Sequence, residues 1–165
     1  DIETLSLASY FAELVHAVTY EDLPAGEILP LLLNALYALG TLKRPCGLVK
    51  PAFEVKLMAL SGFEPLLDRC AICGKEQPEE PMLDVVRGTL HCAGCPQKGG
   101  LSMPLGAAGL AALRHIVYGD PKRLYAFQLP PEELRWVGHA AEAYVAAQLE
   151  RGFRTLDFYK QIKTD

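Results

Sequence analysis

The sequence predicts a mainly α-helical domain of five to six helices with an inserted four-cysteine zinc ribbon, whose strands form a small β-hairpin. Three observations lead to this expectation. Apolar residues recur at helical spacing on both sides of the centre of the chain. Two Cys-x-x-Cys pairs lie in that centre, and a turn separates two short strand-like runs between them. We expect the helical domain at residues 1–66 and 100–165, and the ribbon at residues 67–99.

The segment from Cys70 to Cys95 carries the strongest chemical signal. The pairs Cys70–Cys73 and Cys92–Cys95 are separated by eighteen residues, a spacing typical of structural zinc sites. Zinc takes four tetrahedral ligands with Zn–S bonds of about 2.3 Å, and a two-residue spacer lets one tight turn present both sulfurs of a pair. Four thiolates leave no coordination position for water or substrate, so we expect one structural Zn²⁺.

Disulfides and a redox Cys-x-x-Cys pair are the alternatives to zinc. Disulfide frameworks occur in oxidising compartments and in small cysteine-dense domains, whereas this chain has five cysteines in 165 residues. A redox pair normally begins a helix in a βαβ context, which the sequence does not show. His91, next to Cys92, is expected to be solvated, and the lone Cys46 is expected to be a small buried hydrophobe.

Apolar stripes and helix breakers place the elements before the cysteines. A first helix is expected over residues 1–19, followed by a break at 21–26. A second helix has Pro30 near its first turn and ends near Gly40. A third helix covers about residues 47–61, with Pro51 in its first turn or at its start.

The hairpin and the later helices follow from turn and capping residues. Met82–Val86 and Thr89–His91 are expected to be strands on either side of a turn at Arg87-Gly88. Ser102 and Pro104 are expected to begin a fourth helix that ends at Gly119, and residues 130–133 open a fifth. Thr155 is expected to cap a short last helix that ends at Ile162.

Composition narrows the functional classes. The formal net charge is −4, so the chain as a whole lacks the basic character typical of nucleic-acid binding. No apolar run reaches the roughly 18 residues of a membrane span, and no targeting pattern appears, which predicts a cytosolic protein.

The chain starts at Asp1 without a methionine, as expected of a piece of a longer protein. It has no nucleophile elbow, P-loop or dinucleotide motif, so we expect no enzyme.

Short motifs follow one another along the chain in a specific order. They are Tyr10–Leu14, Phe53-Glu54, Leu57, Leu60, Gly62-Phe63, Pro65, Asp68, the Cys-Ala-Ile-Cys-Gly-Lys run at 70–75, and Gly152–Phe158. The series resembles the RecO family of bacterial recombination mediators over nearly the whole chain. The resemblance implies a helical domain with a zinc insert, preceded in the family by an N-terminal OB-fold that this chain lacks.

The resemblance also implies function and partners. Family members bind single- and double-stranded DNA, which we expect to occur mainly through the missing OB-fold, and they anneal complementary strands. Together with RecR they help load RecA onto DNA covered by single-strand binding protein, without nucleotide hydrolysis. The implied location is the bacterial cytoplasm, in association with the nucleoid. The helical domain of the family offers a pocket to the acidic, hydrophobic-ended tail of single-strand binding protein.

Tail binding needs a cation beside an apolar pocket. Some family members carry arginines just before the Phe-Glu pair, where this chain has Pro51 and Ala52. The candidate cations for partner or DNA binding here are Lys50, Lys56, Arg151 and Arg154. The alternative for each is a solvated surface charge. At the level of the whole chain, the competing hypotheses are a generic zinc-ribbon adaptor of another nucleic-acid-handling complex and a zinc-dependent hydrolase.

Overall fold

The structure, a computed structural model, describes residues 1–19 and 26–163. The elements in this part of the chain are, in order, α1 (Ile2–Val18), α2 (Ile28–Gly40), α3 (Cys46–Leu60), β1 (Pro81–Asp84), β2 (Thr89–Cys92), β3 (Ser102–Pro104), α4 (Ala107–Tyr118), the 3₁₀ turn η1 (Pro121–Arg123), α5 (Pro131–Leu149) and α6 (Arg154–Ile162). The expected break at 21–26 lies outside the described residues except for Gly26. The mainly helical fold with a small sheet is confirmed. No described helix is long and apolar enough to span a membrane.

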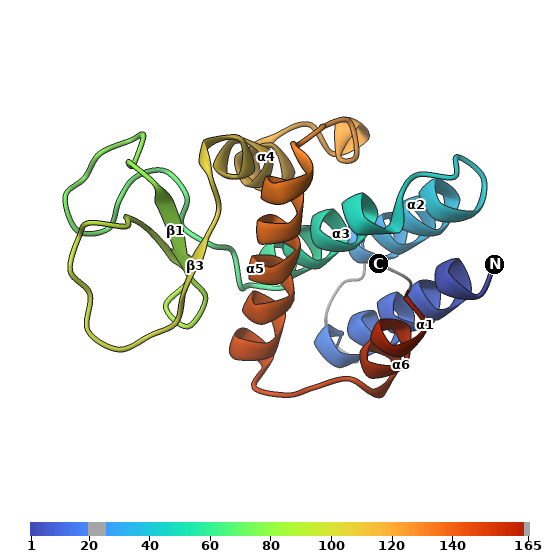
Figure 1. Cartoon of the computed structure of the whole chain (residues 1–165). Helices are drawn as coiled ribbons and strands as arrows, with labels where there is room; N and C mark the ends of the chain where they lie inside the picture. The colour runs from blue at the N-terminus through green and yellow to red at the C-terminus, as the bar shows by residue number, and fades with distance from the viewer. Residues whose placement is uncertain (20–25, 164–165) are drawn as a thin grey trace.

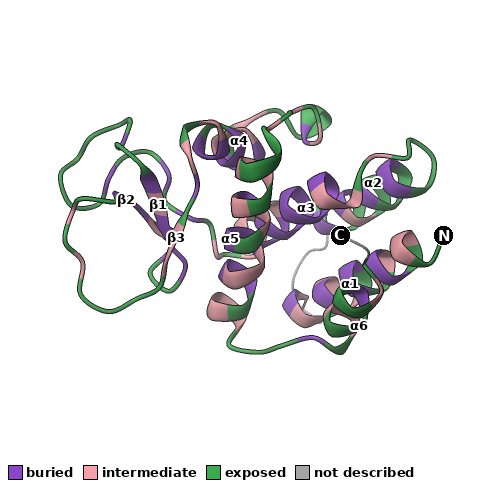
Figure 2. Cartoon of the chain, viewed as in Figure 1, coloured by how far each residue is buried: buried purple, intermediate pink, exposed green. Residues whose placement is uncertain are grey.

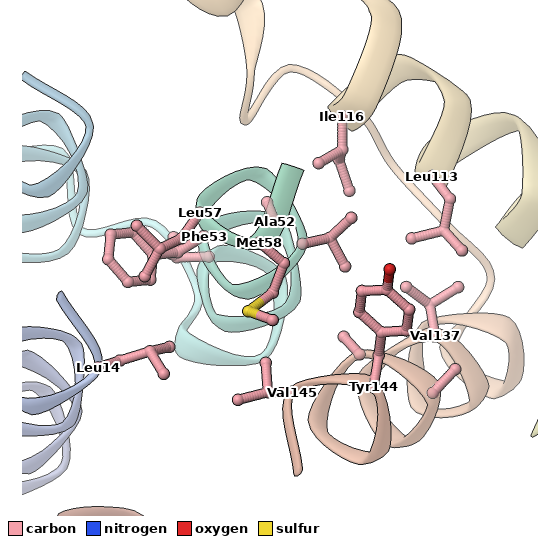
Figure 3. Packing of buried hydrophobic residues seen from close by; sticks show 14 of the residues in the cluster. Leu14, Ala52, Phe53, Leu57, Met58, Leu113, Ile116, Val137, Tyr144 and Val145 are labelled. Carbon is pink, nitrogen blue, oxygen red and sulfur yellow. The ribbon is translucent and has the colours of Figure 1, made fainter. Parts of the chain in front are cut away.

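Helix α3 is the centre of the helical part (Figure 1). Ten of its 15 residues are buried, because α1, α2, α4 and α5 all pack against it. Figure 3 shows Phe53 and Met58 of α3 in the same apolar cluster as Leu14 of α1 and Val137 of α5. The ring of Phe53 stacks on that of Phe11 with centroids 4.0 Å apart. A helix surrounded in this way is buried on nearly all sides.

Pro51 lies inside α3, so the expectation that it stands in the first turn or at the start is wrong. The helix begins at Cys46, with Pro45 in the N-cap position, and this places Pro51 in the second turn. A proline has no N–H, so the carbonyl of Gly47 loses its usual helical partner at a cost of about 3 kcal/mol. Burial of the apolar side chains around Pro51 offsets that cost.

The three strands form an antiparallel sheet in the order β2-β1-β3. The predicted hairpin is confirmed, with Leu83 opposite Leu90 and Gly88 at φ 71° in the turn. The expectation that Ser102 and Pro104 begin the fourth helix is wrong, since they form β3. The reason is long-range pairing, because β3 aligns along β1 while its proline occupies a sheet edge.

The expected cap of the last helix is also wrong. Helix α6 begins at Arg154, so Thr155 lies inside its first turn. The Thr155 hydroxyl donates a 2.6 Å hydrogen bond to Oε1 of Glu13 instead. This bond ties α6 to α1, the helix along which it packs. Figure 2 shows several buried residues along α1, whereas the visible side of α6 is mostly exposed.

The sheet and its long loops lie at one end of the molecule, next to α4 and α5 (Figure 1). Arg114 of α4 fastens the loop before the hairpin, because its guanidinium donates to the carbonyls of Leu67 and Glu76 at 2.8 and 2.6 Å. The division into a helical domain at 1–66 and 100–165 and an insert at 67–99 stays a prediction. Strand β3, at 102–104, belongs to the same sheet as the hairpin.

Candidate metal centre

The four predicted cysteines lie together. Their Sγ atoms are all within 4.8 Å of one another, with Cys70 3.8 Å from Cys95 and Cys73 3.7 Å from Cys92. A tetrahedron with metal–sulfur bonds of about 2.3 Å has edges of about 3.8 Å, whereas a disulfide needs sulfurs about 2.05 Å apart. The cysteines are therefore not paired as disulfides in this structure, and they can hold one metal ion.

Backbone geometry brings the two pairs together. Gly74, directly after the first pair, has φ 81°, and its N–H donates to the carbonyl of Cys70 at 3.0 Å. Only glycine takes this conformation without strain. The second pair begins at Cys92, the last residue of β2, so the hairpin itself returns the chain to the first pair. The backbone N–H of Cys92 then donates to Sγ of Cys70 at 3.4 Å.

The electrostatics of the cluster favour a cation. Burial opposes ionisation of Cys70, but N–H donors from Cys73, Cys92 and Ile72 outweigh burial and lower the pKa of its thiol to about 6. Burial and the neighbouring thiols raise the pKa of Cys95 to about 12. Four thiolates this close repel one another, and a divalent cation between them removes that repulsion. Metal binding here is therefore coupled to proton release.

His91, next to the ligand Cys92, connects two strands of the sheet that carries the site. The expectation that it is solvated is wrong, since it is 4% exposed. Its Nδ1 lies 2.7 Å from the carbonyl of Cys92, and its Nε2 lies 2.7 Å from Oγ of Ser102. The imidazole thus joins the end of β2 to β3. Both of its ring nitrogens already have partners, and the cluster of potential metal ligands consists of the four cysteines without His91.

Among the predicted cations, Lys50 is buried and paired. Its Nζ lies 3.2 Å from Oε2 of Glu54 and 3.0 Å from Oε1 of Glu142, and the residue is 7% exposed. Burial would lower the pKa of Lys50, but the two carboxylates outweigh burial and raise it. The amine is therefore a charged member of an internal network.

The other three predicted cations point to different parts of the surface. Lys56 is half-buried, with its Nζ 3.4 Å from the carbonyl of Val117. Arg151 is exposed and its guanidinium lies 4.3 Å from the ring centroid of Phe153. Arg154 is exposed at the start of α6. The structure does not bring the four together, and their part in binding stays a prediction.

Sequence reasoning missed a second group of cations, which surrounds a cavity of about 540 Å³ between α3, α5 and α6. Arg135, Lys160 and Lys163 line this α3–α5–α6 cavity together with Lys50, against the single carboxylate of Glu142. Apolar, small and aromatic residues form the rest of the lining: Gly47, Pro51, Pro131, Leu134, Gly138, His139 and Tyr159. A helical spacing was the available signal, because Arg135, His139 and Glu142 recur on one side of α5.

Comparison with known proteins gives a consistent family match. The family model described as "Recombination protein O C terminal" matches residues 1–157. The chain is 29% identical over 164 residues to DNA repair protein RecO of Acetivibrio thermocellus, covering 98% of this chain and 64% of that protein. It is 28% identical to DNA repair protein RecO of Symbiobacterium thermophilum, covering 99% and 66%, and 32% identical to that of Anaeromyxobacter sp. strain K, covering 98% and 64%. It thus spans just under two thirds of the length of these curated relatives.

Proposed function

This chain belongs to the RecO family of DNA repair proteins, and we propose that it forms the helical, metal-binding and protein-interaction part of a recombination mediator. In this proposal the whole protein acts with RecR to help load RecA onto single-stranded DNA covered by single-strand binding protein. It also anneals complementary strands without hydrolysing a nucleotide. DNA contact lies mainly in the part outside this chain. The family match over residues 1–157 is the observation that carries the proposal.

The metal we assign to the four cysteines is one structural Zn²⁺. An all-thiolate tetrahedral set is typical of structural zinc sites, and it leaves no open position at which a substrate could bind. Zinc would hold the ribbon folded, since binding energy in such small units, about 10–16 kcal/mol for zinc-finger peptides, is also folding energy. The four-sulfur set also favours a structural role over the hydrolase hypothesis.

The α3–α5–α6 cavity is the place we assign to the tail of single-strand binding protein. That tail is acidic with a hydrophobic end, so it needs an apolar cavity with cations at its rim. The cavity offers Pro51 and Leu134 as apolar lining, with Arg135 and Lys163 as exposed cations. In this chain α5 and α6 would supply the positive charge that some family members place just before the Phe-Glu pair.

The test of the proposed function uses the whole protein. Complementary oligonucleotides coated with single-strand binding protein should anneal faster when the protein is added, with no nucleotide required. With RecR present, RecA filaments should form sooner on the coated single strands. A protein that does neither would overturn the proposal. Such a result would favour the alternative hypothesis of a generic zinc-ribbon adaptor, which the family match disfavours.

A further inference from the structure

A second concave surface lies between α2, the C-terminal end of α3 and the η1 segment. It has a volume of about 650 Å³, which falls within the usual range of ligand pockets, about 300–1,000 Å³. We define the α2–η1 groove by its apolar and cationic lining residues: Leu31, Tyr37, Leu42, Leu60, Lys56 and Lys122. None of the residues lining this groove lines the α3–α5–α6 cavity.

Beside the groove, one apolar side of α2 is exposed; we call this side, which carries Leu29, Leu33 and Tyr37, the α2 crest. Helix α2, from Ile28 to Gly40, contains no charged residue. Its Leu29, Leu33 and Tyr37 are 53%, 55% and 55% exposed. A helix that is apolar all round is normally buried on all sides, so within the described part of the chain α2 has one side without a partner. Tyr37 belongs to both surfaces, which makes the crest continuous with the groove.

Two lysines, Lys56 and Lys122, give the groove its positive charge. Neither Lys56 nor Lys122 forms an ion pair with a carboxylate among residues 1–19 and 26–163. Glu27 is the one acidic residue found in the lining of the described groove. The groove is therefore cationic, although the chain carries a formal charge of −4.

We propose that the α2–η1 groove docks an amphipathic, acidic segment of a partner protein. Apolar side chains of the segment enter the groove and pack against the α2 crest, and its carboxylates pair with Lys56 and Lys122. The aliphatic lining favours a peptide over nucleic acid as the ligand. Apolar side chains of a peptide can be buried against leucine, whereas a phosphate placed there would lose its hydration without a compensating hydrogen bond. This docking site goes beyond the mediator role and does not depend on it.

The test is selection from a library of short random peptides displayed on phage, with the whole protein as the target. Enriched peptides should combine apolar residues at i and i+3 or i+4 with Asp or Glu. The double substitution K56E/K122E should weaken their binding by about tenfold or more, since it reverses both rim charges. Leu33→Asp, on the exposed crest, should weaken it as well without disturbing the core.

Lys98→Glu is the control, because Lys98 is exposed on the ribbon and the variant reverses the charge of a lysine that does not line the groove. It should leave peptide binding unchanged. The assignment would be overturned by a selection without enrichment, by enriched peptides that are basic, or by binding that K56E/K122E does not weaken. Displacement of the selected peptides by a single-stranded oligonucleotide, or by the tail peptide of single-strand binding protein, would equally overturn it as a separate docking site.

Discussion

The phenol of Tyr10 in α1 donates a 2.6 Å hydrogen bond to Oε2 of Glu54 in α3, and both residues are 0% exposed. Lys50 contacts the same carboxylate and also Glu142 of α5, which pairs in turn with Lys160 of α6 at 3.0 Å. One polar chain therefore joins four helices through the core. Because each member of the chain has a partner, the network favours a single arrangement of these helices.

Removal of the central cation should be strongly destabilising. Lys50→Met leaves the buried carboxylate of Glu54 without its cation, and this should lower the free energy of unfolding by about 3–5 kcal/mol. The triple substitution Y10F/K50M/E54L removes the charges of Lys50 and Glu54 together with the phenol of Tyr10, and leaves Glu142 paired with Lys160. It should bring stability back to within about 1 kcal/mol of the native chain or above it. Urea denaturation measures both. A cost below about 1 kcal/mol for Lys50→Met would contradict the network.

The same network predicts a loss of stability in alkali. Burial favours the neutral amine of Lys50, but Glu54 and Glu142 outweigh burial and raise its pKa above 10.5. Burial, and then the charge of Glu54, raise the pKa of Tyr10 above 10.0. Both contributions are complete below the unfolded-state pKa and are lost as pH rises through the folded-state pKa. Above about pH 10.5, the free energy of unfolding of the native chain should fall relative to that of Y10F/K50M/E54L. If the free energies of unfolding of the two proteins change with pH in parallel, the prediction is refuted.

Loss of one metal ligand should unfold the ribbon alone. The helices pack around α3 and not around the cysteines, so Cys70→Ser should abolish zinc binding while most of the helical circular dichroism remains. Elemental analysis should find one zinc per native chain and none in the variant. Cys46→Ser, which changes the cysteine outside the cluster, should keep its zinc. Loss of the entire helical signal in Cys70→Ser would show that the ribbon is not a separate unit.

Arg114 should strengthen metal binding from a distance. Its guanidinium holds the carbonyls of Leu67 and Glu76, on either side of the first cysteine pair. Arg114→Ala frees that loop, and we expect zinc affinity to fall by about tenfold, as for outer-shell partners of metal ligands. Competition with a chromophoric chelator measures the change, with Lys98→Ala as control. An unchanged affinity would mean that the first pair is ordered without α4.

The parts of the fold that could be predicted are those with local causes. Apolar periodicity within one helix and Cys-x-x-Cys spacing within one turn need no knowledge of distant residues. Gly88 likewise marked the hairpin turn, which the structure contains. For this reason the helices, the hairpin and the cysteine cluster were all predictable at the level of single segments.

The parts that could not be predicted depend on partners far along the chain. Strand β3 exists because β1 pairs with it, and a run of three residues carries no strand signal of its own. His91 is buried because its imidazole forms a hydrogen bond with the hydroxyl of Ser102, in that same strand. Lys50 and Glu54, four residues apart, are typical of a solvated helical pair. Only the packing of α1 and α5 on both sides of α3 makes them internal.

The role of this chain as a protein-interaction part is tested most directly by fluorescence anisotropy with the labelled C-terminal peptide of single-strand binding protein. The native chain should bind the peptide, and R135E/K163E should weaken binding by about tenfold or more, because it reverses two exposed charges at the α3–α5–α6 cavity. Lys98→Glu should bind as the native chain does. Absence of binding, or equal binding by all three proteins, would contradict the proposed role.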